Sequence, residues 1–96
     1  IASAKAAVEA LTVTLAAEFA PSIRVNCIAP SLTDSKISQS MLKSEVVAEA
    51  LAKAHPLKRL GEGKDSAALA KFLLSDESSW VTGQIIGVDG GRSALS

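Results

Sequence analysis

The chain has 96 residues, 48% of them hydrophobic, and its ten basic and ten acidic side chains cancel to no net charge. This balance, with only two phenylalanines and one tryptophan, excludes a basic surface that stacks nucleic-acid bases. No apolar run approaches the ~20 residues that a membrane-spanning helix needs. A small autonomous domain buries only about 60% of the surface of its unfolded chain. We therefore expect so apolar a chain to be part of a larger domain, or to bury surface against a partner.

Residues 2–20 show the clearest periodicity in the chain. Apolar side chains recur there every three or four positions, at Val8, Leu11, Leu15 and Phe19. This spacing predicts a helix with one apolar stripe, and the abundant alanine raises its helix propensity. Pro21 is expected to end the helix, because proline removes a backbone donor and clashes with the preceding turn.

Lys5 is the unusual residue of this helix, since alanines surround its charge. Two interpretations are open from the residues alone. Lys5 is either a solvated cation paired with Glu9, four positions later on the same helix face, or one half of a catalytic pair.

Residues 23–29 are short and β-branched, and they predict a strand covered on both faces of a parallel sheet. Cys27 lies within this run, which favours a buried and inert thiol. A single cysteine excludes an internal disulfide and is compatible with a reducing cytoplasm, where we expect the protein to reside. Residues 31–40 follow as a long polar loop, and loops of that length usually carry function.

Two helices and a strand complete the pattern. Residues 44–54 and 65–74 predict helices, separated by a glycine-containing connector at 57–63, and residues 84–88 predict a strand. A turn at residues 89–91 follows, whose two glycines supply positive φ. The expected buried faces are Val47, Leu51 and Ala54 in the first helix and Ala68, Leu69, Phe72 and Leu73 in the second. Two strands separated by helical crossovers imply parallel pairing, so the fold class is α/β.

Six short motifs occur in one order along the chain. They are Lys5 in its alanine-rich helix, Ile23-Arg24-Val25-Asn26-Cys27-Ile28-Ala29-Pro30, Pro56-Leu57-Lys58-Arg59-Leu60-Gly61, Phe72-Leu73-Leu74-Ser75-Asp76, Thr82-Gly83-Gln84 and Val88-Asp89-Gly90-Gly91. Together they resemble the carboxy-terminal part of the short-chain dehydrogenase/reductase family. The resemblance implies that residues 1–96 are the carboxy-terminal portion of one NAD(P)-binding, doubly wound parallel sheet (Rossmann-like). The glycine-rich phosphate loop of such a domain would lie upstream.

The resemblance assigns a role to Lys5. In the family, a tyrosine four residues before the lysine exchanges a proton with the substrate oxygen. The lysine binds the nicotinamide ribose hydroxyls and lowers the pKa of the tyrosine. Lys5 matches this lysine and is expected to be both catalytic and cofactor-binding. Ile1 stands at the tyrosine position and cannot transfer a proton, and the chain contains no tyrosine.

The resemblance also implies that the loop after the first strand binds the nicotinamide side of NAD or NADP. Pro30 and Ser31 stand where the family usually has Pro-Gly. Thr33 takes the position whose backbone amide usually contacts the carboxamide, and Ser35 takes the hydroxyl position that helps to hold it. The expected cofactor-binding set is therefore Lys5, Pro30, Ser31, Thr33 and Ser35. The residue that selects between the two cofactors lies upstream, so the choice stays open.

The remaining polar residues favour structural roles. His55 is a lone histidine at a helix end, where capping or solvent contact is favoured over catalysis. Asn26 is expected to satisfy a neighbouring backbone group, and Trp80 to pack. No group of His, Cys, Asp and Glu has metal-ligand spacing, so no metal is expected.

Two functions stay open from the sequence. One is an NAD(P)-dependent oxidoreductase that transfers hydride to or from a small carbonyl or alcohol substrate, with the 96-residue chain inactive by itself. The other is a non-catalytic NAD(P)-binding or scaffold protein, which Ile1 favours. In both cases we expect no nucleic-acid partner and no membrane partner. We also expect a homo-oligomer (dimer or tetramer) formed through residues 2–20 and 84–88. Residues 36–54 resemble the variable lid that covers the substrate in this family.

Overall fold

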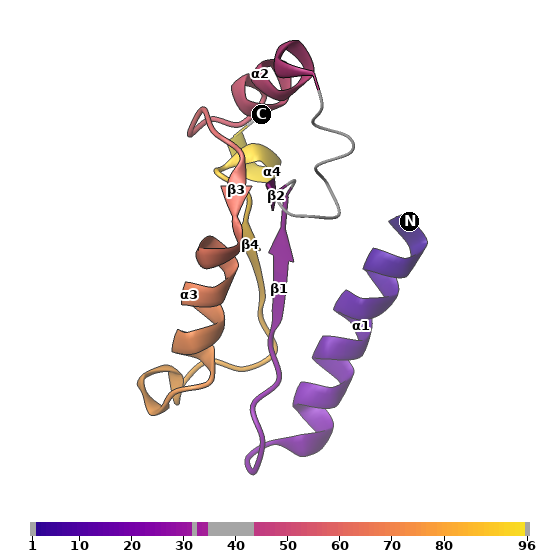
Figure 1. Ribbon diagram of the computed structural model, residues 1–96. Coiled ribbons are helices and arrows are strands. Elements are labelled where there is room, and N and C mark those ends of the chain that lie inside the picture. The colour runs from indigo at the N-terminus through magenta and orange to yellow at the C-terminus, as the bar shows by residue number, and fades with distance from the viewer. Residues whose placement is uncertain (1, 32, 35–43, 96) are drawn as a thin grey trace. The chain divides into compact units, whose positions relative to one another are not determined.

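The computed structural model describes residues 2–31, 33–34 and 44–95. Along the chain, its elements are α1 (Ala2–Phe19), β1 (Cys27–Pro30), β2 (Thr33–Asp34), α2 (Glu45–Lys53), β3 (Gly61–Glu62), α3 (Gly63–Leu73), the 3-10 helix η1 (Asp76–Ser78), β4 (Ile85–Val88) and α4 (Arg92–Leu95) (Figure 1). The chain divides into two compact units, which we call the first unit (residues 1–28 and 69–86) and the second unit (residues 29–68 and 87–96).

Helix α1 confirms the predicted helix, ending one residue before the predicted boundary. Its buried side chains are Thr12 and Ala16, with 6% and 5% of their surface exposed, whereas Leu11 of the expected apolar stripe is 55% exposed. A Cβ placed on Gly83 would lie 3.6 Å from the Cβ of Ala16. Small residues therefore let the turn at Gly83 approach α1 closely, whereas Val8, Leu11 and Phe19 of the stripe stay exposed within this chain.

Strands β1 and β4 are hydrogen-bonded neighbours. The backbone amide of Cys27 donates to the Gln84 carbonyl at 2.8 Å, and that of Ser31 donates to the Val88 carbonyl at 3.3 Å. Both partners advance by four residues in the same direction, so the two strands are parallel, as predicted. Their carboxyl ends lie at the same edge of the sheet.

Strand β1 begins four residues later than predicted, and the segment before it pairs partly through side chains. The Asn26 amide donates to the Val81 carbonyl at 3.0 Å, and its side-chain oxygen accepts from the Gln84 amide at 3.1 Å. This confirms the structural role expected for Asn26. Cys27 is only partly covered, so the prediction of a buried thiol is wrong within this chain.

A second parallel pair lies within segments that the sequence predicted as loop and connector. Strand β2 pairs with β3 in the register Thr33 to Gly61 and Asp34 to Glu62. Two-residue strands are too short to show hydrophobic alternation, so the sequence contains no signal for them. The pair ties the chain that follows β1 to the chain that precedes α3.

Helices α2 and α3 confirm the two predicted helices, and the Ser44 hydroxyl accepts from the Val47 amide at the start of α2. Part of the predicted buried faces is wrong, because Val47, Ala54, Ala68 and Phe72 are exposed. Trp80, which was expected to pack, is 98% exposed. A two-stranded sheet offers too little surface to cover these side chains. Among the helices that the structure describes, none combines the length and apolar character needed to span a membrane.

Candidate functional site

The predicted site residues lie in both units. Lys5 is exposed on α1 in the first unit, and within the described residues its ammonium makes neither a hydrogen bond nor an ion pair. The solvated pair with Glu9 is therefore not formed. In the second unit Pro30 ends β1, Ser31 follows it, and Thr33 begins β2. The two remaining predicted positions, Ile1 and Ser35, lie outside the described residues.

Ser31 lines a pocket of about 300 Å³ in the second unit. The pocket lies at the carboxyl ends of β1 and β4, where ligands bind in open parallel sheets. Its wall consists of Ser31, His55, Leu57, Arg59, Gly61, Asp65, Ser66, Gly87, Val88, Asp89, Gly90 and Gly91. Of the predicted cofactor residues, Ser31 belongs to this wall, which otherwise comes from the segment around β3 and the turn after β4.

His55 is a pocket residue that the sequence did not connect with Ser31. Its side chain is 2% exposed, so the expected solvent contact is wrong. The ring Nδ1 lies 2.7 Å from the Leu51 carbonyl oxygen, which confirms the capping role at the end of α2. The ring Nε2 lies 2.9 Å from the Ser31 hydroxyl. The two residues are 24 positions apart, and neither residue alone signals this contact.

The turn after β4 shapes the same pocket. Gly90 and Gly91 have φ values of 61° and 86°, which confirms the predicted glycine turn. The Leu57 amide donates to the Gly90 carbonyl at 3.1 Å. A Cβ on Gly91 would lie 3.0 Å from a methyl carbon of Leu95 and 3.4 Å from the Pro56 ring. Glycine is therefore required here both by the backbone conformation and by the close neighbours.

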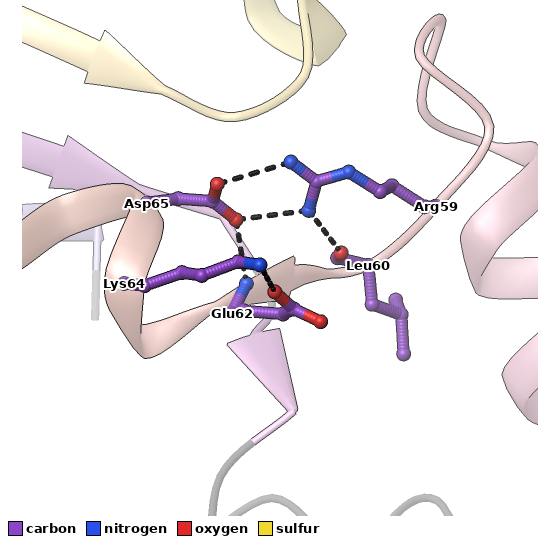
Figure 2. A network of polar contacts seen from close by, with 5 residues as sticks. All are labelled: Arg59, Leu60, Glu62, Lys64 and Asp65. Carbon is purple, nitrogen blue, oxygen red and sulfur yellow. Dashed lines mark hydrogen bonds and ion pairs between the residues drawn. The ribbon is translucent and has the colours of Figure 1, made fainter. Parts of the chain in front are cut away.

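Arg59 and Asp65 form a two-pronged ion pair on the pocket wall, as Figure 2 shows. The guanidinium donates to the two carboxylate oxygens at 2.9 and 3.0 Å, and the Glu62 backbone amide donates to the same carboxylate at 2.8 Å. The hydrogen bond from Arg59, assisted by the one from Glu62, lowers the pKa of Asp65 to about 2. The Asp65 hydrogen bond in turn raises the pKa of the Arg59 guanidinium. The carboxylate of Asp65 therefore stays ionised near neutral pH and also caps the start of α3.

Asp89 is the second carboxylate of the pocket wall, and it too is engaged. It accepts from the backbone amides of Gly91 and Ser93, at 3.0 and 3.2 Å, and from the Ser93 hydroxyl. The hydrogen bond from the Ser93 side chain, followed by those from the backbone amides, lowers the pKa of Asp89. Both carboxylates are thus committed to holding the loops that form the pocket.

Two features bear on a dinucleotide site. Lys5 presents an exposed ammonium, a group that can donate hydrogen bonds to hydroxyls. The 96 residues contain no Gly-x-Gly-x-x-Gly segment for a pyrophosphate. Within the described ranges, no group of three or more His, Cys, Asp and Glu side chains could hold a metal ion.

Comparison with known proteins gives consistent matches. Residues 1–93 match the protein family described as enoyl-(acyl carrier protein) reductase. An uncharacterised short-chain type dehydrogenase/reductase of Sinorhizobium fredii is 46% identical over 90 residues, which cover 93% of this chain and 35% of the relative. Human dehydrogenase/reductase SDR family member 4 is 40% identical over 88 residues, covering 91% of this chain and 32% of the relative. The chain thus spans about a third of the length of these curated relatives.

Solved structures share the fold. Aldohexose dehydrogenase of Thermoplasma acidophilum superposes with a TM-score of 0.90 at 29% identity, over 98% of this chain and 40% of that protein. A short-chain type dehydrogenase/reductase of Mycobacterium ulcerans gives a TM-score of 0.84 at 43% identity, over 92% of this chain and 32% of that one. A 4-hydroxyisoleucine dehydrogenase mutant, solved with NADH and succinate, gives 0.89 at 27% identity, over 96% of this chain and 38% of that protein.

Proposed function

Because this chain belongs to the short-chain dehydrogenase/reductase family, we propose that the intact protein is an NAD(P)-dependent oxidoreductase acting on a small alcohol or carbonyl compound. The observation that carries the proposal is the family match over residues 1–93, which includes the segments around Lys5 and Ser31. The names of the similar proteins, which are dehydrogenases and reductases, support hydride transfer as the reaction class. By itself the 96-residue chain is expected to be inactive, since it lacks a phosphate-binding glycine loop.

The proposed cofactor site combines Lys5 with the chain after β1. Lys5 would bind the nicotinamide ribose hydroxyls, because it is an exposed ammonium without a competing partner in the described residues. Pro30, Ser31, Thr33 and Ser35 would hold the nicotinamide. Ser31 would contribute through its backbone, since its hydroxyl contacts His55. When bound, the cofactor supplies the hydride chemistry, and the chain's part is to orient it and to manage the proton.

A cofactor-binding measurement tests this proposal. Intact wild-type protein is expected to bind NADH or NADPH, seen as a change in nicotinamide fluorescence, and Lys5→Ala is expected to weaken that binding. Lys71→Ala is the matched control, because Lys71 is an exposed lysine on α3. Equal affinity of the Lys5→Ala and Lys71→Ala proteins would contradict the role of Lys5. Absence of binding by the wild type would contradict the proposed function itself.

A non-catalytic NAD(P)-binding or scaffold protein is the second candidate function. It is favoured by one observation, the isoleucine at position 1, where the family's proton-exchanging tyrosine is expected. Such a protein would bind the cofactor without turning over any alcohol or ketone. A panel of secondary alcohols and ketones, assayed at the absorbance maximum of the reduced cofactor, separates the two candidates.

We also propose that the intact protein forms a homo-oligomer through α1 and β4. The support is the apolar surface that α1 leaves exposed in this chain, namely Val8, Leu11, Val13 and Phe19. Two-fold packing of such a helix against its copy would bury this surface. Sedimentation at micromolar concentration should show a dimer or tetramer, and Leu11→Glu should shift it toward a monomer. A wild-type monomer would contradict the proposal.

A further inference from the structure

The His55 ring makes a second contact besides the one that caps α2. The imidazole ring is almost fully buried, yet both of its nitrogens have hydrogen-bond partners. One partner is the backbone carbonyl of Leu51, which ends α2, and the other is the side chain of Ser31 at the end of β1. Capping α2 requires only the first of these contacts. The second links the ring to a hydroxyl on the wall of a pocket.

The Leu51 contact decides which ring nitrogen carries the proton. A carbonyl oxygen can only accept a hydrogen bond, so Nδ1 of His55 must be protonated to make the 2.7 Å contact. In the neutral ring, Nε2 then has a free lone pair and accepts from the Ser31 hydroxyl. The Ser31 oxygen keeps its own lone pairs, so it can accept a further hydrogen bond from a ligand in the pocket.

The other ionisable groups of the pocket wall are unsuited to accept a proton. Asp65 is held ionised by Arg59 and by a backbone amide, and its lowered pKa makes it a weak base. Asp89 is likewise engaged, by two backbone amides and a hydroxyl. The Arg59 guanidinium is permanently charged. The group that remains on the wall is the imidazole of His55, whose Nε2 lies 2.9 Å from the Ser31 hydroxyl.

We propose that Ser31 and His55 form a proton-exchanging pair that binds the hydroxyl group of an alcohol substrate in this pocket. The proposal rests on the proposed oxidoreductase function and adds to it the group that handles the substrate proton. The alcohol donates its hydrogen bond to Ser31 Oγ. As the alcohol proton moves to Oγ, the original Ser31 proton moves to Nε2 of His55. The serine hydroxyl is thereby regenerated, the imidazole becomes an imidazolium, and the alcohol oxygen becomes an alkoxide.

In the reverse direction the imidazolium returns its proton through Ser31 to the alkoxide formed when a carbonyl is reduced. Throughout the exchange Nδ1 keeps its proton on the Leu51 carbonyl, which fixes the ring in place. This arrangement follows the general pattern in which a hydroxyl is hydrogen-bonded to a base and a third group orients that base. Hydride acceptance and donation belong to the bound nicotinamide, outside this pair.

The test uses trifluoroethanol, an alcohol that reports its own binding by fluorine NMR. Titrated with intact wild-type protein, with and without cofactor, trifluoroethanol is expected to shift and broaden. Ser31→Ala should weaken binding about fivefold or more, as expected for the loss of one hydrogen bond. Ser79→Ala removes an exposed hydroxyl from outside the pocket wall and should change the affinity by less than about twofold. His55→Asn keeps an amide near the Nδ1 position to cap Leu51 and should resemble Ser31→Ala.

Nitrogen NMR of protein with labelled histidine separates the proposal from a purely structural role. If His55 only capped α2, the chemical shift of its Nε2 would not change when trifluoroethanol is added. The Nε2 resonance of His55, assigned with His55→Asn, should shift when trifluoroethanol is added to the wild type and stay fixed in Ser31→Ala. Failure of the wild type to bind trifluoroethanol would overturn the proposal, and so would equal binding by Ser31→Ala. If His55→Asn fails to fold, the comparison of Ser31→Ala with Ser79→Ala still decides. Trifluoroethanol binding without cofactor tests the Ser31–His55 pair, and cofactor binding tests the proposed function. A protein that binds trifluoroethanol but no cofactor would therefore refute only the proposed function.

Discussion

The guanidinium of Arg24 donates to the hydroxyl of Ser78 at 2.8 Å, although 54 positions separate the two residues. Ser78 is completely buried. The same guanidinium also donates to the carbonyl oxygens of Leu73 at 3.0 Å and Ser75 at 3.2 Å. These carbonyls lie where α3 ends and η1 begins, and the first of them has no partner within the helix. One side chain from the segment before β1 therefore holds the carboxyl end of α3 in the first unit.

Replacement of Arg24 by methionine should destabilise the intact protein by about 2–4 kcal/mol, because several buried or partly buried acceptors lose a charged donor. The urea midpoint of unfolding measures the change. Arg59→Met is the matched control, since the Arg59 side chain is 54% exposed and exposed ion pairs contribute little to stability. The control should shift the midpoint less. Equal shifts for the two variants would show that the contacts of Arg24 are not what stabilises this region.

Asp65 should make the free energy of unfolding of the protein depend on pH in the acidic range. Its pKa is lowered from 3.8 to about 2 by the hydrogen bonds from Arg59 and Glu62. A carboxyl whose pKa is lower in the folded state stabilises that state above its unfolded pKa. It loses this contribution as the pH falls through the folded pKa. The contribution of Asp65 is therefore present above about pH 4 and disappears between about pH 4 and pH 2.

Asp65→Asn should remove this part of the acid dependence of stability, since asparagine does not titrate. The free energy of unfolding, measured from pH 5 down to pH 2, should fall less steeply in the variant than in the wild type. Asp76→Asn, which changes an exposed carboxylate of η1, serves as the control and should leave the slope in place. Parallel curves for wild type and Asp65→Asn would contradict the prediction.

Substitution of glycine by alanine should have opposite effects at Gly91 and Gly63. Gly91→Ala should destabilise the protein by about 1–3 kcal/mol, because φ is 86° and the added methyl group would meet Leu95 at 3.0 Å. An alanine at Gly63 meets no atom within 4 Å at the start of α3, so Gly63→Ala should be neutral or stabilise by about 0.4–1 kcal/mol. Thermal unfolding of both variants measures this difference. A stabilising Gly91→Ala would show that the turn can relax around the methyl group.

The sequence predicted α1, α2, α3 and strand β4 well because their signals are local, whereas the short helix α4 was not predicted. Alanine content and Pro21 define α1, and the spacing of apolar residues defines α2 and α3. Burial was predicted less well, since periodicity identifies an apolar face without identifying what covers it. Phe72 and Trp80 remain exposed because this chain supplies only a narrow sheet for them to pack against.

The pocket could not be predicted, because the contacts that build it connect distant residues. Pro30 and Ser31 were named from the family pattern, but nothing in the sequence pairs Ser31 with His55. The two-residue strands β2 and β3, which hold the neighbouring chain, carry no periodic signal. His55 was interpreted as a cap from its place before Pro56, and only the distance to Ser31 reveals its second contact. Parallel pairing, by contrast, follows from the order of strands and helices.

Ile1 leads to the last prediction. The family resemblance places a proton-exchanging tyrosine at this position, and a positioned general acid is typically worth ~10²–10⁴-fold in rate. If no other group replaces it, the wild-type protein should turn over alcohols and ketones poorly while still binding cofactor. Ile1→Tyr should then raise the rate, because Lys5, four positions later in the sequence, is expected to lower the pKa of the new phenol as in the family pattern. The rate of cofactor oxidation with a panel of ketones measures the gain.

The pair of Ser31 and His55 changes what this substitution is expected to do. If the pair already exchanges the substrate proton, the wild type is active, and Ile1→Tyr adds little to its rate. Ser31→Ala should then lower the rate, and Ile1→Tyr should restore part of it in the Ser31→Ala background, since a second acid takes over. An inactive wild type that Ile1→Tyr activates would instead assign the missing proton donor to position 1. A cofactor-binding protein that stays inactive in every one of these backgrounds would favour the non-catalytic function.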